Sequence, residues 1–409
     1  MDDSPALPRA WRVGVIAGMA SYLDAAAIVS TSVALVLYQH ALGLTASQVG
    51  LLAGTLAFSI AAGSLSGGRL GDVLGRRVVF TATVGLVAAA AGLLAMATSL
   101  PLLLAGVTLM GLGIGADLPA SLATITELSG DGRRGAMIGL SSVLWLAGIL
   151  ATKIIAAVAG DLGRTGGQVL FAHIAVVAVA VMLSRLTLPE SPSWMRSHQQ
   201  QRVDARTLLQ APYRRPFLAL VAFYALTNLF ANTFGQFGTY VAVNVAGLTV
   251  RTSVLMTLPV LPIGIALGLW FMRVADSPAR MRYFAIGGAL LVAGPLVPAL
   301  SGFTVTSPAA TGVLVAAGSS LAFEPIMKVW TQESFPTLLR SSAQGIVIAV
   351  GRCAAAGFAL VTPGLLERAP RGLYTGLGIA VTLGLVTAWS TFRRPDGALQ
   401  PAAATSAIR

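Results

Sequence analysis

The chain has 409 residues, of which 56% are hydrophobic and only 10% are charged, and its mean hydropathy is +0.80. A soluble domain carries about 25% charged residues, so this composition excludes an ordinary soluble protein and indicates an integral membrane protein. The formal net charge of +12 would suggest a nucleic-acid partner in a soluble chain, but here the basic residues lie between apolar segments. We expect a lipid bilayer as the surroundings and no nucleic acid as a partner.

Twelve apolar segments of roughly 20 residues or more follow one another along the chain, each long enough to cross about 30 Å of hydrocarbon as a helix. Strands of a membrane barrel would need only about 10 residues each, so the sequence predicts an all-α membrane protein. The first segment is too long for a signal-peptide core, and we expect it to remain in the mature protein. The predicted transmembrane helices are 12–38, 47–68, 78–97, 101–128, 135–159, 167–187, 217–243, 250–273, 283–301, 309–334, 341–366 and 371–392.

Arginine residues are distributed unevenly over the connections between these segments. If the N-terminus is cytoplasmic, most arginines fall on the cytoplasmic side, and few face outward, namely Arg164, Arg251, Arg368 and Arg371. Membrane proteins concentrate basic residues in their cytoplasmic connections. We therefore expect both termini in the cytoplasm, which agrees with an even number of spans.

A glycine-rich basic turn, GGRLGDVLGRR at residues 67–77, joins the second and third predicted helices. It resembles the loop between the second and third helices of the major facilitator superfamily of transporters, whose pattern is matched by Gly68, Asp72, Gly75, Arg76 and Arg77. The resemblance implies twelve helices in two pseudo-symmetric six-helix bundles that alternate access to a central site. The helix dipole favours a carboxylate such as Asp72 at a helix start, and we predict that this loop acts as a conformational switch. The alternative is that its positive charge only fixes the topology.

The long polar connection between the sixth and seventh predicted helices divides the chain into two halves. It predicts an N-terminal bundle over residues 1–188, a cytoplasmic linker over 189–216, a C-terminal bundle over 217–394 and a cytoplasmic tail over 395–409. An internal repeat supports this division, because Pro119, Glu127, Arg134 and Gly139 recur as Pro325, Glu333, Arg340 and Gly345. The repeated helix ends add further candidates for the conformational switch, namely Glu127, Arg133, Arg134, Glu333 and Arg340.

Further segments resemble one branch of the superfamily. The stretch LPESPSWM at 188–195 is similar to the PESPRWL signature of sugar porters, and residues 115–135 and 331–345 resemble the fourth and tenth helices of bacterial sugar-porter-like metabolite transporters. Typical sugar porters also carry paired glutamines in the seventh helix and a PETKG-like motif after the last helix, and this chain has neither. The resemblance implies a metabolite:proton symporter and disfavours a sugar as the substrate.

Charged residues inside the predicted helices cost several kcal/mol each unless they line a cavity or find a partner. Asp24 lies near the middle of the first helix, and we predict that it couples transport to protons rather than serving as a static hydrogen-bonded residue. Asp117, in the glycine-rich fourth helix, is a second candidate for proton coupling or a substrate ligand. Its alternative role is to stabilise a bend in that helix. Lys153, in the fifth helix, can extend its charge toward the outer membrane surface.

Polar residues in the second half form a candidate substrate site. Asn228, Asn232 and Gln236 are spaced by four residues and share one helical face, although they could instead form hydrogen bonds between helices. Glu324 and Lys328 are also four residues apart and can form an internal ion pair or contact the substrate. Arg352 keeps its charge at all relevant pH values and needs an anion, either Glu324 or the substrate. The predicted substrate-binding residues are Asn228, Asn232, Gln236, Glu324 and Arg352.

These features favour proton-coupled uptake of a small polar metabolite, such as an organic acid, a polyol or a sugar-like compound. The alternatives are a proton antiporter that exports a drug or natural product, and a receptor of the same fold that does not transport. The chain has no phosphate-binding loop for ATP, its three histidines lack metal-ligand spacing, and its one cysteine, Cys353, lies in an apolar helix. We expect a monomer in the plasma membrane without enzymatic activity, cofactor or metal.

Overall fold

The computed structural model describes residues 7–74, 76–128, 134–187, 205–274, 277–335 and 337–393. Within these ranges the regular structure is helical and no strand occurs. Eleven helical segments are long and apolar enough to cross a membrane, and one further helix contributes a shorter apolar stretch, Val143–Ala159. The predicted all-α membrane fold is therefore confirmed, and each of the twelve predicted spans coincides with helical structure.

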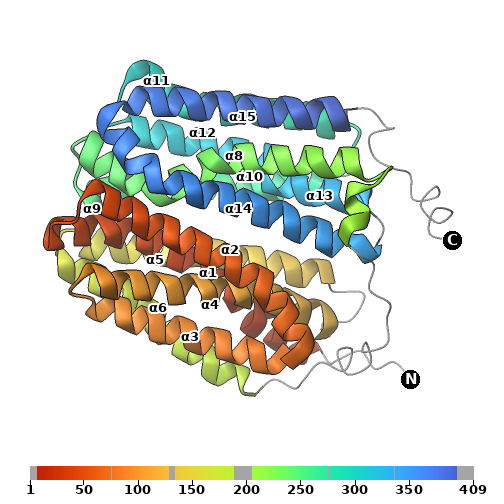
Figure 1. Ribbon diagram of the computed structural model, residues 1–409, viewed down its shortest axis with the longest axis horizontal. Coiled ribbons are helices and arrows are strands. Elements are labelled where there is room, and N and C mark those ends of the chain that lie inside the picture. Colours follow the sequence, from red (N-terminus) through yellow and green to blue (C-terminus); the bar gives the residue numbers. More distant parts are fainter. Residues whose placement is uncertain are drawn as a thin grey trace. The chain divides into compact units, whose positions relative to one another are not determined.

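The first unit comprises Met1–Gln200 together with Thr249–Leu255. Figure 1 shows its main helices in colours from red to yellow-green. They are α1 (Leu7–Leu42), α2 (Ala46–Leu74), α3 (Arg76–Met96), α4 (Leu100–Leu128), α5 (Arg134–Ala159) and α6 (Arg164–Arg185).

The second unit comprises Gln201–Leu248 and Met256–Arg409, coloured from green to blue in Figure 1. The domain boundaries expected at residues 188, 216 and 394 stay a prediction. The elements from residue 205 onward are the 3₁₀-helix η2 (Ala205–Leu209), α8 (Arg214–Tyr240), the π-helical turn η3 (Val241–Val245), α9 (Val250–Thr257), α10 (Val260–Val274), α11 (Arg280–Ser301), α12 (Ser307–Ala322), α13 (Glu324–Ser334), α14 (Thr337–Arg368) and α15 (Pro370–Phe392).

Glycines allow α4 to pack closely against its neighbours in the first unit. A Cβ atom at Gly111 would lie 2.7 Å from the carbonyl oxygen of Leu56 in α2, and one at Gly115 would overlap the carbonyl oxygen of Ile60. Small residues are the usual means by which membrane helices approach one another, because no hydrophobic effect operates between helices in lipid. The glycines of the fourth helix therefore set the distance between α2 and α4.

Two predicted spans consist of two helices each instead of one. The span 250–273 is divided into α9 and α10 next to Pro259, and the span 309–334 is divided into α12 and α13 at Phe323, just before Pro325. Proline lacks a backbone N–H and fits the first turn of a helix better than its interior. A new helix consequently begins at Glu324, and this residue occupies a helix N-terminus.

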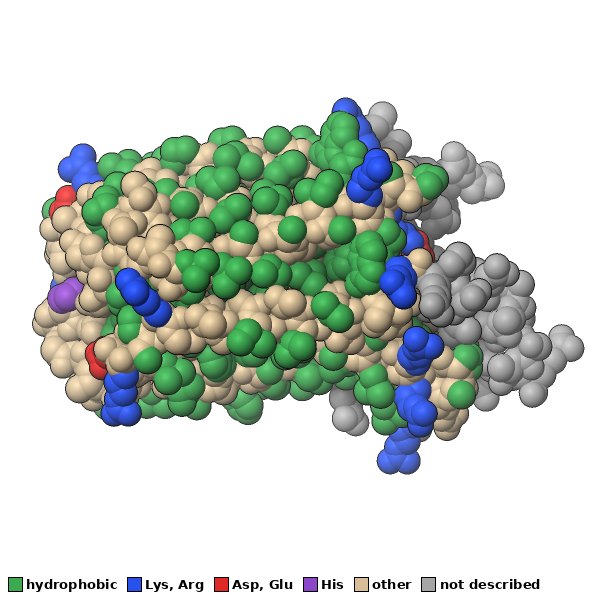
Figure 2. All heavy atoms as spheres, turned by 90° about the horizontal axis from the view of Figure 1, so that it is seen from above, with side chains coloured by type: hydrophobic (Ala, Val, Ile, Leu, Met, Phe, Trp, Pro, Cys, Tyr) green, Lys and Arg blue, Asp and Glu red, His purple; other side chains and the backbone are tan. Residues whose placement is uncertain are grey.

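The outer surface of the helices is apolar along their length, with Lys and Arg side chains toward the helix ends (Figure 2). Exposed apolar residues include Phe58 and Val158 in the first unit and Leu269 and Ile379 in the second. Lipid-facing helices need such a surface, because hydrocarbon offers polar groups no hydrogen bonds.

Candidate functional site

Asp24 is a buried carboxylate in the middle of α1, with only 4% of the residue exposed. The indole Nε1 of Trp145 in α5 donates a hydrogen bond to its Oδ2 atom at 3.3 Å. One turn earlier, the hydroxyl groups of Ser21 and Ser141 are 2.6 Å apart. Asp24 thus faces α5, and the structure places this predicted proton-coupling residue among polar partners within the first unit.

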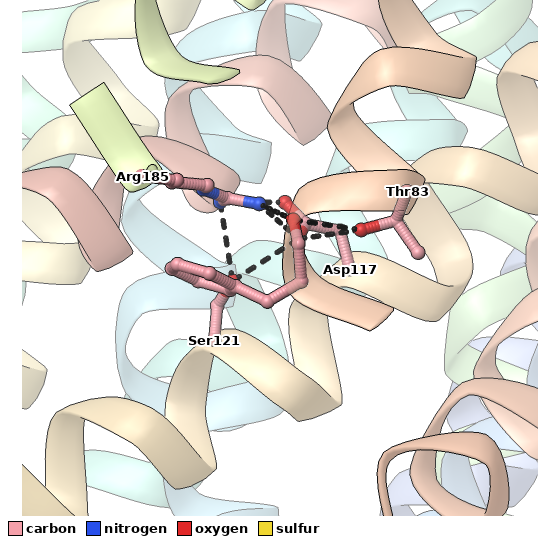
Figure 3. Close-up of polar contacts among 5 residues, drawn as sticks. Thr83, Asp117, Ser121 and Arg185 are labelled. Atoms are coloured by element: carbon pink, nitrogen blue, oxygen red, sulfur yellow. Dashed lines mark hydrogen bonds and ion pairs between the residues drawn. The ribbon is translucent and has the colours of Figure 1, made fainter. Parts of the chain in front are cut away.

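Asp117 lies in a buried polar cluster of α3, α4 and α6 (Figure 3). Arg185 donates from Nη1 to Oδ1 of Asp117 at 2.5 Å and from Nη2 to Oδ2 at 2.9 Å. Thr83 and Ser121 also donate to Oδ1, at 3.0 and 3.3 Å. The side chains of Arg185 and Asp117 are only 0% and 3% exposed, so both charges are compensated inside the protein rather than by water.

Arg185 makes further contacts that connect the same helices. Its Nη1 atom donates to the backbone oxygen of Phe80 at 2.5 Å, and its Cζ atom lies 3.6 Å from the centre of the Phe80 ring, within the range of a cation–π interaction. From the sequence, Arg185 was grouped with the arginines of the cytoplasmic connections. The structure instead shows it buried, because its partner Asp117 lies far away in the sequence and no local pattern links the two.

The structure thus gives Asp24 and Asp117 different surroundings. Asp117 accepts two hydrogen bonds from the guanidinium of Arg185, and Asp24 accepts one from the indole of Trp145. Proton coupling by Asp117 stays a prediction. Proton coupling by Asp24 also stays a prediction.

The second unit brings several predicted substrate residues to one junction of α8, α13 and α14. Tyr224 of α8 stacks on Phe323, with ring centres 5.3 Å apart, and Phe323 directly precedes Glu324. Asn228, one turn after Tyr224, donates through Nδ2 to the backbone oxygen of Gly351 at 3.1 Å. Gly351 directly precedes Arg352. The junction therefore brings together the segments that carry Asn228, Glu324 and Arg352. For Asn228, however, the observed hydrogen bond joins two helices, which is the alternative to a role in substrate binding.

Glu324 and Lys328 form an ion pair on α13, with Oε1 and Nζ 2.7 Å apart. Arg352 of α14 is close enough to interact electrostatically with Glu324. The side chains of Glu324 and Lys328 are 42% and 50% exposed although they belong to the apolar segment Ser307–Thr331. Charges exposed to hydrocarbon would be costly, so this face of α13 is not suited to contact with lipid. The internal pair exists, and contact with a substrate stays a prediction.

The amide stripe of α8 continues beyond the junction. Gln236 donates through Nε2 to Oδ1 of Asn232 at 3.2 Å, so the predicted spacing of four residues does bring these amides together. Gln236 is 7% exposed, and its Oε1 atom has no hydrogen-bond partner among the described residues. The stripe therefore contains a buried acceptor that remains available to a hydroxyl or N–H donor.

Only part of the predicted switch is described. Glu333 forms an ion pair with Arg280 at the start of α11, with Oε1 and Nη1 2.5 Å apart. Arg340, the other switch candidate of the second half, has its side chain outside the described residues. The side chains of the other switch candidates also lie outside them, namely Gly68, Asp72, Gly75, Arg76, Arg77, Glu127, Arg133 and Arg134.

Comparison with known proteins decides the family. Residues 14–360 match the sequence model of the Major Facilitator Superfamily. The chain belongs to the major facilitator superfamily. It is therefore a multi-pass membrane transporter and not an enzyme, and the family predicted from the loop at residues 67–77 is confirmed.

Similar proteins of this superfamily include transporters from bacteria and animals. The minor myo-inositol transporter IolF of Bacillus subtilis (strain 168) is 32% identical over 397 residues, which cover 91% of this chain and 87% of that protein. The inner membrane metabolite transport protein YgcS of Escherichia coli (strain K12) is 26% identical over 95% of this chain and 92% of its own length. The proton myo-inositol cotransporter of Homo sapiens is 29% identical over 51% of this chain and 32% of its own length.

Solved structures show the same fold. The crystal structure of a D-xylose-proton symporter has a TM-score of 0.80 with this chain at 16% identity, and the comparison covers 93% of this chain and 97% of that one. An inward open xylose transporter from E. coli has a TM-score of 0.77 at 15% identity, with 93% and 96% of the two chains covered. The predicted architecture of the superfamily is therefore confirmed for this chain.

Proposed function

We propose that this transporter takes up a polyol of the myo-inositol type together with protons. The observation that carries the proposal is the 32% identity to a myo-inositol transporter along 91% of the chain. The relatives also include a proton myo-inositol cotransporter and polyol transporters of Arabidopsis thaliana. The proposed location is the inner membrane of the cell, with both termini in the cytoplasm and the chain acting as a monomer.

The chemistry of the α8 stripe suits a polyol. Each hydroxyl group of a polyol is both a donor and an acceptor, and amide side chains offer both functions without a net charge. The Oε1 atom of Gln236 can accept a hydroxyl, and the bond between Gln236 and Asn232 fixes the orientation of the amide. Glu324 and Lys328 form an ion pair with one another, and the choice of a polyol rests on the amide stripe and the relatives rather than on the charges of this junction.

Asp24 is the proposed coupling residue. Its carboxylate would accept a proton from one side of the membrane and release it on the other as the transporter alternates between its two open states. Trp145 can donate to the ionised carboxylate, and proton binding changes that interaction. The protonation of Asp24 is thereby coupled to the position of α1 relative to α5.

Binding measurements with purified protein test the substrate class. We expect myo-inositol and linear polyols to raise the melting temperature, since a ligand at 100 times its Kd stabilises the folded state by about 2.7 kcal/mol. Xylose, nicotinate and dicarboxylic acids should have smaller effects. A shift produced by an acid and by no polyol would refute the proposed substrate class.

Replacing Gln236 tests the site itself. The change Gln236→Leu removes the free acceptor, and the loss of one hydrogen bond of about 0.5–1.5 kcal/mol should weaken polyol binding by up to about tenfold. Thr362→Val is a matched control, because the Thr362 hydroxyl is already bonded to the backbone of Phe358. Equal affinities of Gln236→Leu and wild type, measured by calorimetric titration with myo-inositol, would remove Gln236 from the site.

A further inference from the structure

A line of polar side chains follows the contact between α1 and α5, of which Ser21, Asp24 and Ser141 are buried and Trp145 is 40% exposed. Ser21 bonds to Ser141 and Asp24 bonds to Trp145, and a Cβ atom at Gly148 would overlap the backbone of Tyr22 and lie 3.2 Å from Ala25. In each contact, the α5 residue number exceeds the α1 number by a similar amount. The two helices therefore run parallel along this contact, which we call the α1–α5 seam. The offset is 123 to 126 at Gly148, and the register of the two hydrogen-bonded pairs is 120 to 121.

The same register pairs Thr31 with Thr152 farther along the seam. Each lies seven residues, or two helical turns, beyond Asp24 and Trp145, and hence on the same helix faces. Farther along, Gly166 of α6 lies close to both Leu37 of α1 and Ala159 of α5. Thr31 and Thr152 are 2% and 0% exposed, so both hydroxyl groups are buried.

The hydroxyl groups on the two sides of Asp24 differ in whether they have hydrogen-bond partners. On the side toward Leu7, Ser21 and Ser141 satisfy one another at 2.6 Å. On the side toward Leu42, the hydroxyl oxygens of Thr31 and Thr152 have no hydrogen-bond partner in the described protein. A threonine in a helix can donate to a carbonyl of the preceding turn, as Thr108 does to the backbone oxygen of Leu104. Thr31 and Thr152 make no such bond in the described protein. Their position at one level on two packed helices therefore distinguishes this part of the seam.

Buried hydroxyl groups without protein partners are normally satisfied by internal water. The rise of an α-helix separates Thr31 from Asp24 by about 10 Å along the helix axis. About three waters at ordinary hydrogen-bond spacing bridge such a distance. The seam thus contains the polar groups for a chain of water that ends at an otherwise buried carboxylate.

We propose that the α1–α5 seam conducts protons between the Leu42 end of α1 and Asp24, by a route that does not use the α8 stripe. Each water or hydroxyl on the route accepts one proton and passes on another, so that only the Asp24 carboxylate gains a proton. The inference rests on the proposed coupling through Asp24. Tyr22, on α1 itself, forms a hydrogen bond with His173 of α6. The other titratable residues near the seam, in the described segments packed against α1, are Tyr38 on α1, Asp117 on α4, Lys153 on α5, and Arg164 and Arg185 on α6.

The double variant Thr31→Val with Thr152→Val tests the route, since valine keeps the shape of threonine and removes the hydroxyl. In reconstituted vesicles, uptake of labelled myo-inositol driven by a proton gradient should fall by about tenfold, as expected for the loss of water-bridged hydrogen bonds. Counterflow exchange, which needs no net proton movement, should stay close to wild type. The conservative pair Thr31→Ser with Thr152→Ser should restore uptake, and Thr108→Val should have no effect.

A second readout needs no substrate. The infrared band of the protonated Asp24 carboxyl is identified by its loss in Asp24→Asn, and the rate at which this proton exchanges with heavy water is then measured. We expect slower exchange in the double valine variant and wild-type exchange in the double serine variant. Unchanged exchange and unchanged gradient-driven uptake would overturn the inference, as would an equal loss of uptake and counterflow. Proton-driven accumulation by Asp24→Asn would instead refute the proposed coupling.

Discussion

At the scale of single residues, the Asp117–Arg185 pair is the strongest polar feature that the structure describes in the first unit. Four donor groups surround the carboxylate, and the guanidinium also contacts the backbone and ring of Phe80. A buried ion pair contributes little net stability compared with apolar residues of similar size. Removing one of its two residues is nevertheless costly, because the remaining charge is then buried without a partner. The pair therefore connects α3, α4 and α6 through one buried cluster.

The change Arg185→Met should destabilise the protein by about 3–5 kcal/mol, because it leaves the Asp117 charge buried and unpaired. The double variant Asp117→Leu with Arg185→Met removes both charges and should recover much of that loss. Thermal unfolding in detergent compares the variants with wild type. An Arg185→Met protein as stable as wild type would show that the pair does not hold these helices together.

At the scale of helices, close contacts between backbones determine the packing of the first unit. Gly115 lies against the backbone of Ile60 in α2, whereas no atom lies within 4 Å of a Cβ added to Gly92 in α3. Both glycines are inside helices and differ only in the space available to a side chain. They form a matched pair for testing how α2 and α4 approach each other.

Gly115→Ala should lower the free energy of unfolding by about 1–3 kcal/mol, because the methyl group would force the helices apart. Gly92→Ala should be neutral or stabilise the protein by about 0.5–1 kcal/mol, because alanine favours the helix. Melting temperatures of the two variants measured side by side test this difference. Equal effects of the two changes would contradict the assigned packing.

The helices were predictable from sequence to different degrees. Long apolar runs and the GGRLGDVLGRR loop were sufficient for the spans and the family, because length and hydropathy dominate in a bilayer. The breaks at Pro259 and Phe323 were missed, because the apolar run continues across each break. The Asp117–Arg185 pair was missed because its partners lie on helices distant in sequence, whereas the amides of α8 were predictable from their spacing of four residues.

At the scale of the whole molecule, transport requires that the protein change between states while the substrate site stays intact. The candidate switch is the segment 67–77, which the structure divides between the end of α2 and the start of α3. Asp72 therefore lies in the last turn of α2 and not at the helix start that the sequence predicts. The side chains of this segment lie mostly outside the described residues, so its role as a switch rests on the sequence. An ion-pair network present in only one state shifts the balance between states without contacting the substrate. Glu333 and Arg280 form an ion pair at the ends of α13 and α11.

Asp72→Asn should slow transport while leaving the Kd for myo-inositol nearly unchanged, because the loop governs switching and not recognition. Turnover in vesicles and equilibrium binding are measured on the same preparation. Asp161→Asn serves as a control, since Asp161 lies in another connection, between α5 and α6, and its contact with Arg251 is long, at 3.8 Å, with both side chains more than half exposed. A large loss of binding with unchanged turnover would contradict the switch assignment.

The most direct test of the central claim compares wild type and Asp24→Asn in vesicles with an imposed proton gradient. Wild type should accumulate labelled myo-inositol above its external concentration, and a protonophore should abolish this accumulation. Asp24→Asn should not accumulate it but should retain counterflow exchange, because the amide resembles the protonated acid and cannot release a proton. Accumulation by Asp24→Asn at the wild-type level, or accumulation by wild type without a proton gradient, would contradict proton-coupled uptake through Asp24.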